Sequence, residues 1–249
     1  MKLTSLKEFI DENLLIEWYR TRKDGGYRKY EKDFPEEESN SNKRQIHEVH
    51  PEITEEHKKH LRPYVNTSNK VNPAEVDRNE STHDRKRRES FHSTLHKAIG
   101  RDSDKNNMSI KHNAHVFRGQ AHAPRLDSSG HMTTDKATSW TTHPGVAHQN
   151  AKRNQNEHTS AHHIIALHHR QETGHRMISL AEPVHNHHEE EVVSGPAKYK
   201  VTKSTQIGIH KDGKPIIRHD VEHIQSHPHW DASKSGPLSE KEHEIAKNW

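Results

Sequence analysis

The sequence predicts an α+β fold, and three observations support this prediction. Apolar residues recur at helical spacings in the first part of the chain, up to about residue 100. Short apolar or alternating runs, which are typical of strands, follow from residue 110 onward. Glycine and proline separate these runs, as they do at turns. Helices first and short strands afterwards are typical of an α+β domain.

The chain divides into three parts by composition. Residues 1–18 form an amphipathic pattern, with apolar residues spaced three or four apart at Leu3, Leu6, Ile10, Leu14 and Trp18. Residues 19–45 are charged and poor in aromatic residues in their second half, which is typical of a linker. We therefore expect an N-terminal helix and linker over 1–45, a folded domain over 46–210, and a polar C-terminal tail over 211–249.

The elements of the folded domain follow from local patterns. Two helices are predicted by apolar faces at Ile53, His57 and Leu61 before Pro63, and at Phe91, Leu95 and Ile99 before Gly100. Strands are predicted at 115–117, 164–167, 176–180, 191–193 and 198–202. Pro144 starts a further predicted helix directly after a hydroxyl-rich strand.

The composition excludes several classes of protein. Of 249 residues, none is cysteine, so disulfides and cysteine metal sites are excluded. The longest apolar runs fall far short of the ~18 residues of a membrane-spanning helix, and Lys7 and Glu8 interrupt any signal-peptide pattern. Lys and Arg are nearly balanced by Asp and Glu, which argues against nucleic-acid binding. We expect an intracellular protein without membrane contact.

Two carboxylates form the sharpest local feature of the chain. In an extended segment Glu189 and Glu191 point the same way, and their Cα atoms lie roughly 6–7 Å apart. Carboxylates at that distance can serve the two ends of one displacement reaction. Taken alone, however, the acidic run is also typical of a charged strand edge.

Two further motifs lie upstream of these carboxylates. Arg118 ends an apolar strand and precedes Gly119, where its planar guanidinium can bind a pair of phosphate oxygens. Ser139, Trp140 and Thr141 form a hydroxyl-rich strand that leads into the helix beginning at Pro144. Each motif also has an ordinary interpretation, as a β-turn or a strand-to-helix connection.

In this order the three motifs resemble the Arg–Ser–Glu class of mono-ADP-ribosyltransferases. Phe117-Arg118-Gly119 resembles the strand-end arginine of that class, and Ser139-Trp140-Thr141 resembles its Ser-Thr-Ser motif. Glu189-Glu190-Glu191 resembles its Glu-x-Glu motif, and residues 61–72 resemble the helical segment before the arginine. The match covers roughly 46–205, and His148 departs from it by standing where the class has an apolar helix face.

The resemblance implies a fold, a reaction and a role for each residue. The fold would have N-terminal helices followed by two small packed sheets, rich in antiparallel strands, around an NAD cleft. NAD would be consumed as a substrate, with no metal required and no metal ligands. Its site would comprise Arg118, Gly119, Ser139, Trp140, Thr141 and Glu191. Arg118 would hold NAD, Ser139 would orient Glu191, Glu191 would stabilise the oxocarbenium, and Glu189 would address an acceptor arginine on a protein.

A second resemblance concerns the source of the chain. Residues 1–15 resemble the capsid-targeting segments of internal proteins in T-even-like bacteriophages, and Leu15-Ile16-Glu17 resembles their prohead protease sites. This implies bacterial host proteins as acceptors, action in the host cytoplasm, and packaging in the virion. An ordinary amphipathic helix that docks on its own domain fits this segment equally well, and a secreted toxin domain is a further possibility.

Two other functions stay open at this point. The chain has 28 histidines, and pairs such as His162-His163 and His168-His169, with a third group at His185, His187 and His188, are dense enough to bind zinc or nickel. No His-Glu-x-x-His spacing accompanies them. The other possibility is an internal or scaffolding protein without enzymatic activity.

Overall fold

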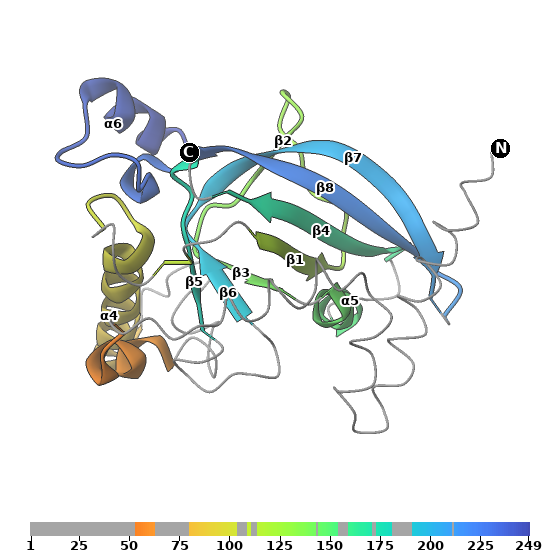
Figure 1. Ribbon diagram of the computed structural model, residues 1–249, viewed down its shortest axis with the longest axis horizontal. Coiled ribbons are helices and arrows are strands. Elements are labelled where there is room, and N and C mark those ends of the chain that lie inside the picture. The colour runs from red at the N-terminus through yellow and green to blue at the C-terminus, as the bar shows by residue number, and fades with distance from the viewer. Residues whose placement is uncertain are drawn as a thin grey trace.

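The computed structural model describes residues 53–62, 80–103, 109–110, 114–142, 144–153, 159–170, 173–180, 191–210 and 212–249. Two predicted features, the N-terminal helix with its linker over 1–45 and the segment 63–72, lie outside the described residues. The described part is a mixed α+β structure in which helices flank a curved sheet (Figure 1), so the predicted fold class is confirmed.

Within the described residues, the strands form an eight-stranded sheet in the order β2-β7-β8-β4-β1-β3-β6-β5. Their bounds are β1 Ala114–Gln120, β2 His131–Thr133, β3 Thr138–Thr141, β4 His162–His169, β5 Met177–Ser179, β6 Glu191–Ser194, β7 Ala197–Ile209 and β8 Pro215–Ser226. Neighbouring strands are antiparallel, except that β4 and β8 run parallel. All five predicted strands are present, although β7 extends seven residues beyond its predicted end at 202.

The resemblance led us to expect two separate small sheets, whereas the described strands are continuous. The two parts, β2-β7-β8-β4-β1 and β3-β6-β5, are joined where β1 pairs with β3 at one position, Phe117 opposite Thr141. By contrast, β1 and β4 are paired along the whole length of β1, from Ala114 to Gln120. The single paired position explains how two half-sheets can differ in direction (Figure 1) and still belong to one hydrogen-bonded sheet.

Helix α4, Thr82–Ile99, has the apolar face that its sequence predicts. Ser81 caps its N-terminus by accepting a hydrogen bond from the Asp84 backbone N–H at 3.0 Å. Phe91, Leu95 and Ile99 are buried and pack against Ile178 of β5 and Val193 of β6, together with Leu61 of the helical residues 55–62 and Ile53 just before them. Both predicted helices of this region are therefore present, and their shared face covers the β5–β6 end of the sheet.

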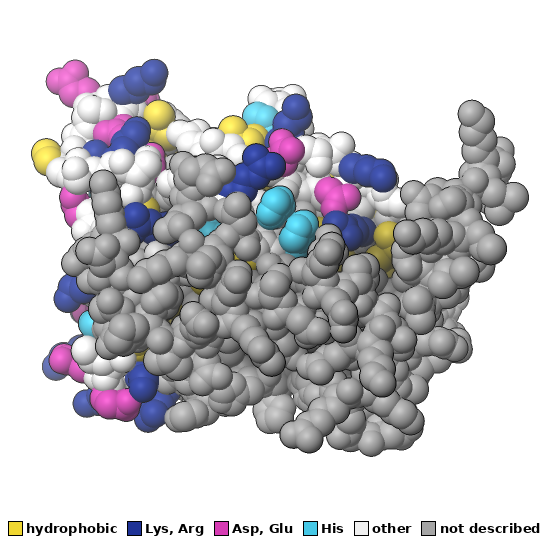
Figure 2. All heavy atoms as spheres, viewed as in Figure 1, with side chains coloured by type: hydrophobic (Ala, Val, Ile, Leu, Met, Phe, Trp, Pro, Cys, Tyr) yellow, Lys and Arg dark blue, Asp and Glu magenta, His cyan; other side chains and the backbone are white. Residues whose placement is uncertain are grey.

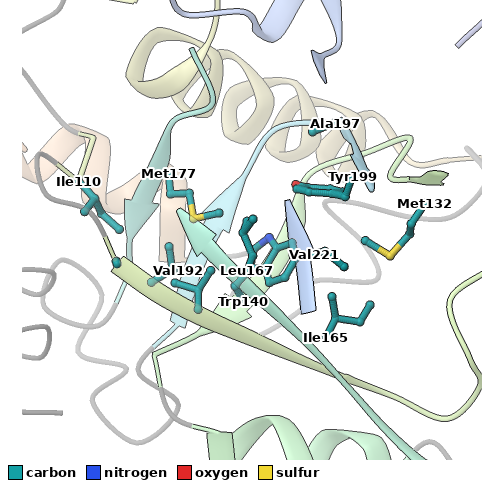
Figure 3. Packing of buried hydrophobic residues seen from close by; sticks show 12 residues of the cluster. Ile110, Met132, Trp140, Ile165, Leu167, Met177, Val192, Ala197, Tyr199 and Val221 are labelled. Atoms are coloured by element: carbon teal, nitrogen blue, oxygen red, sulfur yellow. The ribbon is translucent and has the colours of Figure 1, made fainter. Parts of the chain in front are cut away.

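The largest core cluster lies between the two parts of the sheet (Figure 3). Trp140 of β3 and Tyr199 of β7 are its largest members, and their rings meet edge-on at a centroid distance of 5.6 Å. The Trp140 indole N–H donates a hydrogen bond of 3.0 Å to Ser194 Oγ. A buried indole with a satisfied N–H stabilises the contact between strands β3, β6 and β7.

Helix α5, Pro144–Arg153, begins at the predicted proline and lies directly against β1 and β4. The approach is closest at Gly119, where an added Cβ would lie 1.6 Å from the Ala147 carbonyl oxygen. Any side chain at position 119 would therefore push α5 away from the sheet. The close approach of α5 therefore explains why a glycine follows Arg118.

The predicted C-terminal tail over 211–249 is corrected by the structure. Strand β8 lies inside the sheet between β7 and β4, and helix α6, Glu240–Lys247, follows the 3-10 turn Pro228–Trp230. The polar composition of this segment predicted a tail, whereas polar residues also occur in strands that bury one face only. Strands β7 and β8 each bury one face and expose many side chains on the other. The folded domain therefore extends well beyond residue 210 and includes β8 and α6.

The surface that faces the viewer in Figure 2 carries charges of both signs over the strands. Among its coloured side chains, Lys and Arg alternate with Asp and Glu, and histidines lie between them. Charges arranged in this way weaken one another's fields. No helix in the part of the chain that the structure describes is long and apolar enough to cross a membrane.

Candidate active site

Arg118 lies near the end of β1, opposite Ile165 of β4. Its Nη1 donates a hydrogen bond of 3.2 Å to the backbone carbonyl of Ser139 on the neighbouring strand β3. The guanidinium is thereby held at the junction of the two parts of the sheet. This is the point where β1 and β3 separate after their pairing at Phe117 and Thr141.

Ser139 and Glu191 meet across the next pair of strands. Glu191 is the first residue of β6 and pairs with Thr141, while Ser139 pairs with Val193. The Ser139 hydroxyl donates a hydrogen bond of 2.6 Å to Glu191 Oε1. Only 7% of Glu191 is exposed, so its carboxylate is held in a largely buried environment. Arg118, Ser139 and Glu191 are thus linked by two hydrogen bonds across three adjacent strands.

The alternation of side chains along β3 separates the roles of its residues. Ser139 and Thr141 face the side on which Glu191 lies, whereas Trp140 faces the core cluster. Trp140 is 2% exposed and its indole N–H is bound to Ser194, so it anchors the strand instead of presenting a surface to a ligand. The expectation that Trp140 contacts NAD directly is therefore revised.

Glu189, the second predicted carboxylate, lies outside the described residues, and so do Glu190 and the histidines at 185, 187 and 188. Of the Glu-x-Glu motif, the structure describes Glu191 alone. The predicted role of Glu189 in addressing an acceptor stays a prediction from the sequence.

A cleft of about 490 Å³ opens beside Arg118. It is lined by residues 118–125, from the end of β1 into the segment after it, by residues 132–138 before Ser139, and by Ile165 of β4. Arg118, Arg125 and Lys136 line it against one carboxylate, Asp135. An excess of cationic side chains in a concave site of this size suits a ligand that carries phosphates.

Arg125 and Lys136 were not among the site residues predicted from the sequence. Each lies several residues from a recognisable motif, in segments that connect strands. Only the folding of these connections around Arg118 brings their charges into one cleft. The signal that could have identified these two residues is that their segments are close in the sequence to Arg118-Gly119 and Ser139.

The resemblance placed an apolar helix face where His148 stands, and the structure shows a different packing. His148 is 4% exposed and packs edge-on against His162 and His210, with ring centroids 5.0 and 5.3 Å away. Burial, followed by the nearby His162 and His210 rings, lowers the pKa of His148 to about 4. A neutral imidazole therefore replaces the expected apolar side chain on this face of α5.

Within the described residues, one group of side chains could hold a metal ion. His162, His210 and Asp212 offer ligand atoms that all lie within 4.8 Å of one another. Burial raises the pKa of Asp212, but hydrogen bonds from the Lys214 backbone and from the His210 and His162 rings outweigh this effect and hold it well below its usual range. This group does not include Arg118, Ser139 or Glu191.

The chain was compared with known proteins at the level of sequence and of structure. No protein-family model and no curated protein matches it. Similar solved structures include the Vis toxin, an ADP-ribosyltransferase from Vibrio splendidus, at 13% identity over 93% of this chain and 92% of that one, with a TM-score of 0.46.

Two other similar structures are smaller matches. The C3 exoenzyme of Clostridium limosum is 11% identical over 76% of this chain and 94% of its own, with a TM-score of 0.46. Plx2a, an ADP-ribosyltransferase toxin from Paenibacillus larvae, is 10% identical over 87% of this chain and 98% of its own, with a TM-score of 0.43. These similarities are low, so the case for a function rests on the residues of this chain.

Proposed function

We propose that the chain is a mono-ADP-ribosyltransferase that cleaves NAD and transfers ADP-ribose to arginine on acceptor proteins. The observation that carries this proposal is the linked set of Arg118, Ser139 and Glu191. The three residues come from three motifs that are far apart in the sequence and occur in the order expected for this class of enzyme. A chance acidic strand edge would give no reason for the other two motifs to lie beside it.

The cleavage of NAD needs its reactive ribose to be held and its developing charge to be stabilised. The bond to nicotinamide breaks with oxocarbenium character, as in glycoside hydrolysis, and the leaving group departs as neutral nicotinamide. A buried carboxylate next to the ribose lowers the energy of this cation, because few water molecules screen it. Glu191 has the burial for this role, and its hydrogen bond from Ser139 fixes its orientation.

The cleft beside Arg118 provides a place for the diphosphate of NAD. Arg118 presents a planar fork of donors to phosphate oxygens, and Arg125 and Lys136 add positive charge along the same cleft. NAD held in this way would place its nicotinamide ribose towards Ser139, whose backbone carbonyl accepts the hydrogen bond from Arg118. NAD is a consumed substrate in this scheme, and no step requires a metal ion.

Arginine is the proposed acceptor because of Glu189. A guanidinium is protonated at ordinary pH, so a carboxylate must orient it and accept a proton as its nitrogen attacks the ribose carbon. Glu189 stands two residues before Glu191 in the Glu-x-Glu motif. Exchanging Glu189 for glutamine should abolish transfer to arginine while cleavage of NAD by water continues, and Glu190→Gln serves as the matched control.

The test of the proposed function uses labelled NAD, a bacterial lysate and the purified full chain. We expect labelled protein bands and released nicotinamide, in the presence and absence of EDTA. Glu191→Gln should lower both signals by at least about 100-fold, in line with the loss of one preorganised electrostatic contact. Glu222→Gln, an exposed glutamate of β8, is the control and should leave both signals unchanged. Intact NAD after incubation with the folded wild-type chain would refute the proposal.

We further propose that the acceptors are bacterial host proteins and that residues 1–15 direct packaging into a phage capsid. The sequence resemblance of this segment supports the proposal. Virions purified from infected cells should then contain the chain, with its N-terminus beginning after Glu17. Mass spectrometry of such particles tests this directly, and a chain that keeps residues 1–17 or stays outside the virion would refute it.

A further inference from the structure

A group of histidines and one aspartate lies at the end of the β7–β8 hairpin, away from the proposed reaction site. His162 is the first residue of β4, His210 directly follows β7, and Asp212 lies in the turn that leads to β8. His162 is fully buried and His210 is 6% exposed, whereas 35% of the Asp212 side chain is exposed. The group therefore has two buried imidazoles and one carboxylate that reaches the surface.

The polar atoms of this group converge. The carboxylate of Asp212 lies 3.1 Å from His162 Nε2 and 2.9 Å from His210 Nδ1. The two imidazole rings lie 4.6 Å apart between centroids. In a tetrahedral zinc site with bonds of about 2.0–2.1 Å, the ligand atoms are separated by about 3.3 Å. Small side-chain movements would therefore convert the present arrangement into a coordination shell.

We propose that His162, His210 and Asp212 bind one zinc ion, which fastens the β7–β8 hairpin turn to the start of β4. Two imidazoles and one carboxylate form a ligand set that suits zinc and other late first-row metals better than magnesium or calcium. The partial exposure of Asp212 gives the ion a path of entry. His148 of α5 packs against both imidazole rings and holds them in place.

The alternation of side chains along β4 places this zinc site on the opposite face of the sheet from Arg118. His162 lies on the same face as Ile164, which packs with Ala147 of α5. Arg118 pairs with Ile165, whose side chain lies on the other face, in the main core cluster. The ion would therefore lie on the opposite face of the sheet from Arg118, and its ligands are separate from the hydrogen-bonded set of Arg118, Ser139 and Glu191.

With this ion in place, one end of the sheet would be stabilised by helices and the other end by a metal ion. The β7–β8 hairpin ends in a short turn around Gly213, a residue with a positive φ of 82°. The described helices α4 and α6 lie at the other end of the sheet from this turn (Figure 1). A metal ion that links the turn to β4 would limit fraying of the two longest strands, because it joins three segments at one point.

The experiment must separate this site from adventitious binding, since the chain has 28 histidines. The full chain without an affinity tag is stripped with EDTA, dialysed and titrated with Zn²⁺ by calorimetry. We expect one ion bound more tightly than any others, and an increase in Tm on adding one equivalent. Cobalt(II) at the same stoichiometry should give the strong visible absorption of a tetrahedral site.

Matched variants assign the binding to these residues. Asp212→Asn and His162→Gln should each weaken the tight binding by more than about 100-fold and remove the increase in Tm. The control is His163→Gln, which replaces the adjacent buried histidine on the other face of β4, where His163 Nδ1 lies 2.9 Å from His219 Nε2. Because Asp212 is partly exposed, Asp212→Asn should fold even if His162→Gln does not.

The outcomes distinguish this proposal from the proposed function. Zinc affinity that is unchanged in Asp212→Asn, or weak binding of several equivalents in the wild-type chain, would overturn the zinc site. Transfer of label from NAD should continue after zinc is removed, at a temperature where the chain stays folded. Absence of label transfer, with tight zinc binding present, would refute the transferase and leave the zinc site standing.

Discussion

The Ser139 hydroxyl donates a hydrogen bond of 2.6 Å to Glu191 Oε1, and this contact joins strand β3 to the first residue of β6. The acceptor is a largely buried carboxylate. Hydrogen bonds to a charged group are stronger than those between neutral groups, so the contact fixes the direction in which the other carboxylate oxygen points.

Ser139→Ala should therefore lower kcat for nicotinamide release by about 10- to 100-fold, which corresponds to the roughly 1.5–3 kcal/mol of a hydrogen bond to a charged group. The KM for NAD should change little, because Ser139 positions Glu191 and does not hold the diphosphate. Steady-state kinetics over a range of NAD concentrations measures both constants. Ser139→Thr keeps a hydroxyl and should restore much of the lost rate. An alanine variant with unchanged kcat would show that the contact has no role in the reaction.

Arg118→Lys should raise the KM for NAD by about 10-fold, because an ammonium keeps the charge but loses the planar pair of donors. The same kinetic measurement serves for this variant. The control is Arg170→Lys, at an exposed arginine after β4, which should behave as the wild-type chain does. If Arg118→Lys changed kcat alone, Arg118 would act on the reacting ribose and not on the diphosphate.

Gly119→Ala should prevent α5 from packing on the sheet, since the added Cβ would lie 1.6 Å from the Ala147 carbonyl oxygen. Backbone atoms cannot move aside as a flexible side chain can, so the variant should be destabilised by several kcal/mol or fail to fold. Thermal unfolding followed by circular dichroism measures the effect. Gln120→Ala, at the next position of β1, is the control, and a Gly119→Ala variant as stable as this control would contradict the close approach.

Stability should depend on pH through the buried histidines near Tyr199. Burial, followed by the charge on nearby histidines, lowers the pKa of His169 to about 4, and the same causes hold the pKa of His175 well below its ordinary value. Such a group is neutral in the folded chain, while the unfolded chain takes up a proton below pH ~6.5. Its contribution is therefore fully present above pH ~6.5 and is lost as the pH falls towards 4.

The free energy of unfolding should fall between pH 7.5 and pH 5, by about 2 kcal/mol for a group whose pKa drops from 6.5 to about 4. Urea titrations at the two pH values measure this difference. His169→Gln should make the difference smaller, whereas His83→Gln, at an exposed position of α4, should leave it unchanged. A stability that rises on acidification would contradict the neutral state of these rings.

Arg101 should hold the C-terminal segment against the end of α4. Its Nε donates a hydrogen bond of 2.7 Å to the Gly236 carbonyl, and its Nη1 donates one of 3.1 Å to Glu242 Oε1 at the start of α6. Arg101→Met should release this segment, lower Tm by more than about 5 °C and make the chain near residue 236 sensitive to protease. Arg85→Met, on the exposed side of α4, is the control and should remain resistant. Equal protease resistance of the two variants would contradict the role of Arg101.

The local patterns of the sequence predicted much of the fold and of the candidate site. Phe91, Leu95 and Ile99 define a helix face by spacing alone, and the short apolar runs define β1, β4, β5 and β6, because these signals depend on neighbours in the chain. Arg118, Ser139 and Glu191 were identified in the same way, from short motifs in a fixed order. The sequence alone therefore determined these three candidate residues and the elements in which they lie.

The tertiary structure decided what each element contacts. From the sequence, β8 was predicted as part of a polar tail, but in the folded chain it pairs in parallel with β4. Trp140 was predicted to bind a ligand, but it is buried in the main core cluster. His162 and Asp212 are 50 residues apart in the chain, and their contact depends on that same β4–β8 pairing. Contacts between distant segments depend on which apolar faces bury one another. The spacing of residues within one segment does not specify which other segment it will pack against.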